Sequence, residues 1–262
     1  SFEDTAALAK HIQECLTNET LYQSYHDWRD RPLNSEFVEK FAFTNVSTEC
    51  RTCRWVYAHK HGLPWDKKSQ TFELGSKEIF EKIAATNEWG DPESISGAGS
   101  TVEVNRFRVQ CLKEFIQKHD IKNVYDIPCG DANWQHGLLT NNVQYYGSDI
   151  SNHALEQAKR KNKKYESMHF LESINLIDSV PNVDLPEHSL FLSKEVIQHL
   201  PIKDGVSMLN NIKKSGVRYL AATNHDARLF NVEKNNNIET GSFYPNNLFL
   251  PPFHFHKPMV DC

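Results

Sequence analysis

Segments typical of strands alternate with segments typical of amphipathic helices from residue 76 onward. The expected strands are residues 123–127, 144–150, 168–173, 189–193 and 218–224. The expected helices are residues 76–89, 103–119, 133–141, 152–165 and 202–214. Because parallel strands need crossover helices, the alternation predicts an α/β fold with a Rossmann-like doubly wound, mostly parallel sheet covered on both faces.

The composition changes near residues 65–76, WDKKSQTFELGS, and we expect a domain boundary there. Before it, residues 2–18 carry apolar positions at helical spacing, and the rest is aromatic and basic with few strand-like runs. The sequence therefore predicts a small irregular N-terminal appendage, residues 1–75, and a main domain, residues 76–262. A chain of 262 residues holds at most two domains.

Charge and hydropathy exclude some classes of protein. The net charge of −5 and the spread of lysines and arginines argue against a nucleic-acid partner. No apolar run approaches the roughly 20 residues that cross a bilayer, so we expect no membrane span. The chain begins at Ser1 without a signal peptide and resembles an excised piece, so the compartment stays open. The oligomeric state stays open as well.

The segment NVYDIPCGDANW, residues 123–134, begins as a buried strand and turns abruptly at Gly130. In a doubly wound sheet this turn lies at the switch point, where ligands bind. Asp149 follows Gly130 by nineteen residues, the spacing of an acid that binds ribose hydroxyls. Pro128 and Ala132 stand where a dinucleotide site needs glycine, so a nucleoside ligand without phosphates is favoured.

Three of these segments, VYDIPCGDANW, YYGSDIS and SLFLSKEVIQHLP, resemble the first, second and fourth strand motifs of class I S-adenosylmethionine-dependent methyltransferases. Residues 79–101 and 241–258 resemble the leader and the tail of one subgroup of that family. The resemblance covers roughly residues 77 to 262. It implies a seven-stranded sheet, S-adenosylmethionine as the methyl donor and no required metal.

By this resemblance, the turn from Asp126 to Gly130 faces the methionine part of the cofactor, Asp149 binds the ribose and Ile150 packs on the adenine. The acid that usually ends the third strand is missing: Ser173 and Ile174 stand there, with Glu172 or Asn175 as substitutes. The candidate cofactor-binding residues are Asp126, Pro128, Cys129, Gly130, Asn133, Trp134, Asp149, Ile150, Glu172 and Lys194.

Several of these residues also have structural interpretations. Asp126 is a good turn cap, and Asp149 is an ordinary residue at a strand end. Cys129 has no base near it in sequence, so a small buried side chain describes it better than a nucleophile does. Trp89 and Trp134 are equally consistent with core aromatics.

Two histidines are candidates for the general base that a hydroxyl acceptor requires. His199 follows the fourth strand directly, at the expected cofactor rim, and its alternative is a helix-start histidine bonded to backbone. His225 follows the strand at 218–224 and is the second candidate. His254 and His256 have no carboxylate or cysteine at ligand spacing, so we expect no metal there.

The first 65 residues resemble the carboxyl-terminal tail of α-1,3-fucosyltransferases in the segments LYQSYHDWRDRPL and FAFTNVSTECRTCRWVYAHKHGL. The resemblance implies that Cys50 and Cys53 are disulfide-bonded and that the compartment is the secretory lumen (Golgi); otherwise it is cytoplasmic. A competing interpretation is zinc, bound by the two cysteines with His59 and His61. The sequons at Asn18 and Asn45 agree with a lumen.

Together the two resemblances predict a methyltransferase that modifies an oxygen acceptor, a sugar hydroxyl of a fucosylated glycan. One alternative is methyl transfer to a small metabolite or a protein. The other is a non-catalytic domain attached to a fucosyltransferase, an alternative that the missing third-strand acid keeps open.

Overall fold

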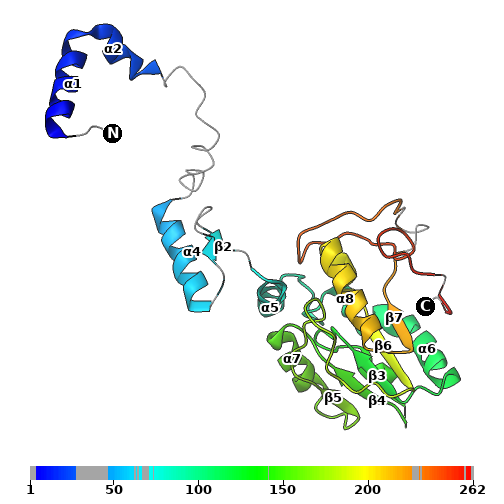
Figure 1. The fold of residues 1–262 in the computed structure, drawn as a ribbon. Coiled ribbons are helices and arrows are strands. Elements are labelled where there is room, and N and C mark those ends of the chain that lie inside the picture. The colour runs from blue at the N-terminus through cyan, green and yellow to red at the C-terminus, as the bar shows by residue number, and fades with distance from the viewer. Residues whose placement is uncertain are drawn as a thin grey trace. The chain divides into compact units, whose positions relative to one another are not determined.

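The computed structural model describes residues 4–27, 47–61, 63, 65–66, 71–72, 74–140, 142–225, 230, 232–256 and 258–260. The chain divides into two compact units, Ser1–Glu73 and Leu74–Cys262 (Figure 1). We expected the division after residue 75. Within the described ranges, no helix has the length and apolar character needed to cross a membrane.

The first unit contains short helices and a two-residue hairpin. Its elements within the described residues are α1 (Thr5–Thr17), α2 (Glu19–Ser24), α4 (Thr48–His61), β1 (Trp65–Asp66) and β2 (Thr71–Phe72). The prediction of an irregular appendage is wrong for α4. The Ser47 hydroxyl accepts the Cys50 amide at 3.3 Å and caps the helix, and the Trp55 and His59 rings stack one turn apart at 5.2 Å.

Cys50 and Cys53 are exposed free thiols on α4, so the structure does not support the disulfide that the resemblance implied. Residues three apart on a helix hold their Cβ atoms about 5 to 6 Å apart, beyond the roughly 3.5 to 4.5 Å of a disulfide. Residues 28–46, which carry part of the fucosyltransferase resemblance and the Asn45 sequon, lie outside the described residues.

The second unit is built on a parallel sheet of order β5-β4-β3-β6-β7, drawn as arrows in Figure 1. Its strands are β3 (Asn123–Asp126), β4 (Gln144–Gly147), β5 (Met168–Phe170), β6 (Ser189–Ser193) and β7 (Tyr219–Ala222). All five were predicted. The resemblance implied seven strands, and the described part of the unit has five.

Four helices follow the predicted pattern: α5 (Ser76–Thr86), α6 (Val102–Lys118), α7 (Asn152–Asn162) and α8 (Ile202–Lys214). Three 3₁₀ turns add η3 (Ala98–Ser100), η4 (Gln135–Leu138) and η5 (Ile197–His199). The helix expected at 133–141 is only η4, because the backbone at Leu139 becomes extended.

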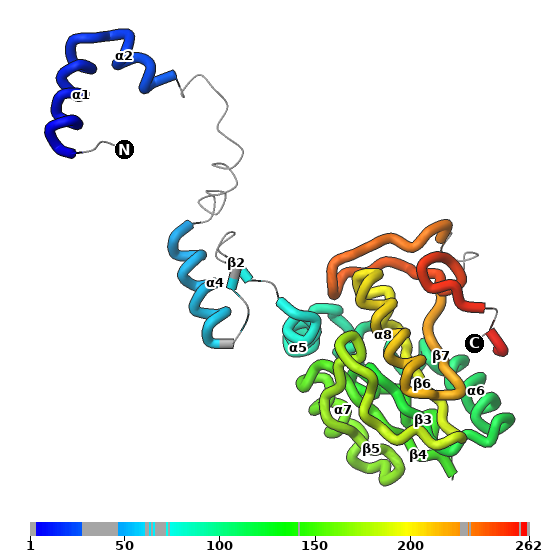
Figure 2. The backbone as a smooth tube through the Cα atoms, viewed as in Figure 1, coloured from blue at the N-terminus to red at the C-terminus, as the bar shows by residue number. Residues whose placement is uncertain are grey.

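The central strands are buried on both faces, and their pleat divides the core in two. Val124 of β3 packs in a cluster with α6 and α7 side chains, whereas its neighbour Tyr125 packs in a cluster with α8. Figure 2 traces the same wrapping of helices around the sheet. The predicted doubly wound α/β fold is confirmed.

Strand β3 lies between β4 and β6, so the connections leave it in opposite directions. Side chains at the carboxyl ends of these strands therefore border a crevice that no crossover fills. Asp126 ends β3, and Lys194 directly follows β6. This edge is where a ligand site is expected.

Candidate functional site

A cavity opens at the carboxyl edge of β3, β4 and β6. It holds about 770 Å³ of empty space, a volume that includes open solvent at its mouth. The strand ends supply Asp126, Asp149 and Lys194, and helix α5 with the following loop supplies apolar and serine side chains. The cavity thus has a charged floor and a mainly apolar cover.

Asp126 is 1% exposed and has one satisfied and one unsatisfied carboxylate oxygen. Its Oδ2 accepts from Gln135 Nε2 and from the Tyr145 hydroxyl, both at 2.8 Å. Its Oδ1 has no donor among the residues that the structure describes. Burial raises the pKa of Asp126 to about 7, although the two hydrogen bonds act against this shift. An unpaired buried carboxylate oxygen is costly, and it marks a place for a cationic or hydrogen-bond-donating ligand group.

Asp149 is bonded to the turn that the sequence singled out. Its Oδ2 accepts the Gly130 amide and its Oδ1 the Ser151 amide, each at 2.8 Å. Burial raises the pKa of Asp149 to about 6, and these amides oppose the shift. Each carboxylate oxygen retains a second lone pair, so the side chain can still accept from a ligand diol.

Gly130 is required by both its backbone and its surroundings. It has φ of +58°, and a Cβ at this position would lie 2.2 Å from Ser96 Oγ. Ser96 belongs to the loop that covers the cavity, so the turn and the loop are in close contact. The sequence predicted that glycine at this turn allows a ligand to approach the backbone. In the structure, glycine also allows Ser96 of the loop to approach it.

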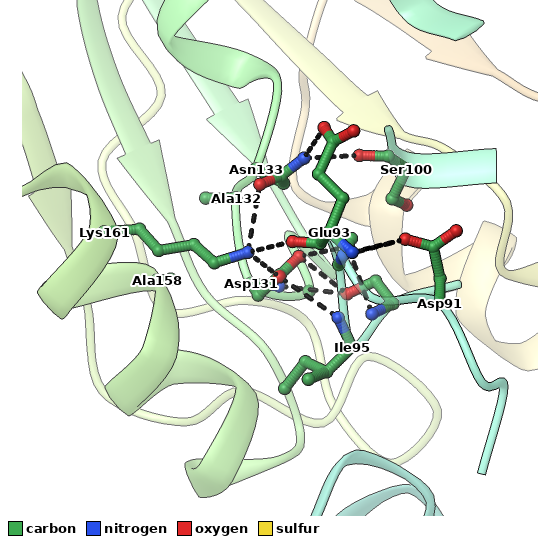
Figure 3. A network of polar contacts seen from close by, with 12 residues as sticks. Asp91, Glu93, Ile95, Ser100, Asp131, Ala132, Asn133, Ala158 and Lys161 are labelled. Carbon is green, nitrogen blue, oxygen red and sulfur yellow. Dashed lines mark hydrogen bonds and ion pairs between the residues drawn. The ribbon is translucent and has the colours of Figure 1, made fainter. Parts of the chain in front are cut away.

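Asp131, also 1% exposed, is the centre of a polar network that joins the turn to the covering loop (Figure 3). Its Oδ1 accepts from the hydroxyls of Ser94 at 2.7 Å and Ser96 at 3.2 Å. Its Oδ2 accepts from the Ile95 amide at 3.3 Å and from Lys161 Nζ at 2.6 Å. We call these residues, Ser94, Ile95, Ser96, Asp131 and Lys161, the loop clamp.

Asn133 extends the loop clamp instead of facing the cavity. Its Nδ2 donates to Glu93 Oε1 at 2.6 Å and to the Ser100 carbonyl at 3.1 Å, and its Oδ1 accepts from Lys161 at 3.0 Å. Figure 3 shows Lys161 reaching from α7 to this network. The structure therefore places Asn133 apart from the predicted cofactor contacts.

Lys194 is held inside the cavity. Its ammonium donates to the Gly99 carbonyl at 2.8 Å and lies 3.8 Å from the Glu195 carboxylate. It also lies 5.8 Å from the centre of the Trp134 ring. Burial lowers the pKa of Lys194 to about 8. Asp126 and Lys194 thus bring opposite charges to one cavity.

His199, from η5, lines the cavity next to Glu195. Its ring lies 4.9 Å from that of Trp89 and 5.7 Å from that of Phe243, centre to centre. Burial lowers the pKa of His199 below its usual value, so the neutral imidazole prevails at pH 7.

His225 is in a different environment. It is buried, its Nδ1 accepts the Asn246 amide at 3.3 Å, and its ring packs edge-on against Phe230 and Phe243. The described cavity wall includes His199 and not His225. Of the two candidate bases, the geometry favours His199.

Four of the remaining predicted cofactor-binding residues line the cavity, and one, Glu172, does not. Pro128, Cys129, Trp134 and Ile150 line it. Cys129 is buried and burial raises the pKa of its thiol well above the usual value, which agrees with a packing role. The Glu172 side chain is exposed and lies apart from the cavity wall, while the Ser173 hydroxyl donates to the Ile150 carbonyl at 3.0 Å.

Sequence reasoning missed the apolar cover and Glu195. Phe80, Ile83 and Ala84 of α5 line the cavity, although the periodicity of α5 predicted only an amphipathic helix. Glu195 has φ of +55°, a conformation unusual for a residue other than glycine and one that clusters at functional sites. Within the described ranges, no three His, Cys, Asp or Glu side chains are grouped so as to hold a metal.

The sequence matches no protein-family model and no curated protein. Among solved structures, the chain is similar to magnesium protoporphyrin IX methyltransferase from Synechocystis PCC 6803 with bound SAM. That similarity has 18% identity and a TM-score of 0.44, and covers 60% of this chain and 79% of that one.

Two further structures show similarities of the same order. For the N-methyltransferase NodS from Bradyrhizobium japonicum WM9 with S-adenosyl-L-homocysteine, the identity is 13% and the TM-score 0.41, over 54% of this chain and 68% of that one. For the methyltransferase domain of bacterial CtHen1-CN, the identity is 20% and the TM-score 0.41. This similarity covers 45% of this chain and 65% of that one.

Proposed function

We propose that the second unit is a methyltransferase that binds S-adenosylmethionine in the cavity at the carboxyl edge of the sheet. The observation that carries the proposal is the buried, unpaired Oδ1 of Asp126 at this edge. A ligand ammonium group would supply the missing donor, and Lys194 would bind the carboxylate of the same amino-acid group. Asp149 would accept hydrogen bonds from the ribose hydroxyls.

The remaining cavity residues also fit this ligand. Ile150 and the apolar side chains of α5 offer a surface on which an adenine ring can pack. The turn at Gly130 lacks the glycines of a pyrophosphate site, which agrees with a nucleoside ligand. The bound cofactor supplies a methyl group activated by a sulfonium.

The chain's own residues would align the acceptor and take its proton. Most of the acceleration of such a displacement comes from holding the reacting atoms close and in line. His199 would accept the hydroxyl proton on its ring nitrogen, since its lowered pKa keeps it neutral. Trp89 and Phe243, whose rings lie 4.9 and 5.7 Å from this ring, would contact the acceptor.

For the acceptor, we propose a sugar hydroxyl on a fucosylated glycan, in the secretory lumen. The support is the resemblance of residues 1–65 to a fucosyltransferase tail, together with the aromatic rings beside His199, which suit the apolar face of a sugar ring.

A methylation assay on a glycan array tests this proposal. The full chain is incubated with radiolabelled S-adenosylmethionine, and label on fucosylated glycans above that on matched unfucosylated ones is the expected result. Label on neither set, from a protein that binds the cofactor, would refute the glycan acceptor and leave cofactor binding intact.

A further inference from the structure

The C-terminal segment returns to the cavity and is bonded to the turn that carries His199. The Gly241 amide donates to the His199 carbonyl at 2.8 Å, and the Tyr244 amide donates to the Gln198 carbonyl at 3.0 Å. Between these two bonds, the Ser242 carbonyl lies 2.8 Å from His199 Nδ1. Three hydrogen bonds therefore fix residues 198–199 against residues 241–244.

The bond to Ser242 determines which ring nitrogen of His199 carries the proton. A backbone carbonyl only accepts, so His199 Nδ1 must donate, and the neutral ring has its proton there. The lone pair is then on Nε2. A general base needs this free lone pair, and the opposite tautomer would present an N–H to the acceptor.

We propose that Gly241 is the positioning residue that holds His199 in its base-competent tautomer. The inference rests on the proposed function, in which His199 takes the acceptor proton. Gly241 acts through the backbone and touches no reacting atom. The acceptor proton moves to Nε2, while the Nδ1 proton stays on the ring and its hydrogen bond to Ser242 stabilises the imidazolium that forms.

Only glycine allows this arrangement at position 241. Its φ is +85°, and a Cβ there would lie 2.9 Å from Ile83 Cδ1 and 3.1 Å from Ile79 Cγ2 of α5. Both side chains belong to the helix that covers the cavity. An alanine would require either the two isoleucine side chains or residues 241–242 to shift, and a shift of residues 241–242 would displace the Ser242 carbonyl from His199.

Gly216 offers a matched control. Its φ of +78° is close to that of Gly241, and a Cβ there would meet nothing within 4 Å. Gly216→Ala and Gly241→Ala therefore carry a similar conformational strain, and only the second disturbs the contact with α5 and His199.

The test combines nitrogen-15 NMR of the His199 ring at pH 8 with steady-state kinetics, for the parent and both variants. We expect the parent to carry the proton on Nδ1. Gly241→Ala should lose this preference and lower kcat by about 10- to 100-fold, with cofactor affinity within a few-fold, because misplaced groups cost rates of that order. Gly216→Ala should change neither quantity.

Different results separate the inference from the proposed function. A proton on Nε2 in the parent overturns the inference, even if Gly241→Ala fails to fold. A parent that methylates its acceptor while both glycine variants keep the parental tautomer and kcat refutes the inference alone. A parent that binds no cofactor refutes the proposed function and the inference with it.

Discussion

Asp126 and Asp131 lie five residues apart around one turn, are equally buried, and have opposite environments. Asp131 receives hydrogen bonds on both oxygens, from three side chains and one amide of the loop clamp. Asp126 has two donors on one oxygen and none, among the described residues, on the other. A carboxylate whose hydrogen bonds are complete stabilises the fold, whereas one left incomplete in a cavity is available to a ligand.

This comparison separates two regions of the second unit, the cavity wall, which we propose binds the ligand, and the loop clamp, whose hydrogen bonds join the turn to the loop. Variants of the wall should impair binding or turnover and leave folding intact. Variants of the clamp should mainly lower the free energy of unfolding, with a smaller effect on binding or turnover.

The largest expected effect is on turnover at the cavity wall. His199→Ala should reduce kcat by about 100-fold or more, since general-base catalysis is typically worth 100- to 10,000-fold. The parental rate should rise with pH through the lowered pKa of His199, because the neutral ring is the active form. Steady-state kinetics measure both. A loss of less than about threefold would make His199 a structural residue, and a large loss in His225→Ala would move the base to that position.

The next effect is on stability at the loop clamp. Asp131→Ala removes the acceptor of the two serine hydroxyls and one of the acceptors of Lys161, which keeps the Glu93 carbonyl and Asn133 Oδ1. It should lower the free energy of unfolding by about 2 kcal/mol, within the range for buried donors left without a partner. Urea denaturation measures it. Glu156→Ala, which removes the exposed partner of Lys159 on the same helix, is the control and should cost less than about 0.5 kcal/mol. An equal loss of unfolding free energy in the two variants would show that the loop clamp stabilises the fold no more than an exposed ion pair does.

Asp149→Ala should weaken S-adenosylmethionine binding by about 30-fold, the equivalent of losing hydrogen bonds from a ribose diol to a charged group. Fluorescence titration of the tryptophans gives the dissociation constant, and circular dichroism checks the fold. Unchanged affinity in a folded variant would remove Asp149 from the cofactor site.

A smaller effect is expected from pH. Burial raises the pKa of Asp126 to about 7 and that of Asp149 to about 6, against roughly 3.9 in an unfolded chain. Between pH 4 and 7 the folded state therefore binds more protons than the unfolded state, and the stability of the free protein should fall as pH rises through this window.

The stabilisation by cofactor should depend on pH in the opposite sense. A cationic ligand prefers the ionised carboxylate, so the rise in melting temperature on adding cofactor should be larger at pH 7 than at pH 5.5. Asp126→Asn should flatten that difference, and an unchanged profile in this variant would argue against the assignment.

The strands and the turn at Gly130 could be predicted from sequence because their signals are local. The strand ending at Asp126 and the nineteen-residue spacing from Gly130 to Asp149 follow from the repeat of one βαβ unit. The clamp could not be predicted, since the partners of Asp131 lie 30 to 37 residues away, and nothing in the sequence distinguishes the loop serines or Lys161 of α7 from other serines and lysines. The same holds for the bond between His199 and Ser242, which spans 43 residues.

Calorimetric titration of S-adenosylmethionine into the parent and Asp126→Asn tests the central claim most directly. The amide keeps the shape of the carboxylate and an oxygen for Gln135 and Tyr145, and loses the charge that would bind the ligand ammonium. The account predicts one site per chain in the parent and about tenfold or weaker binding in the variant, the loss expected for one charge-assisted hydrogen bond. A parent that binds no cofactor, or a variant that binds it equally well, would contradict it.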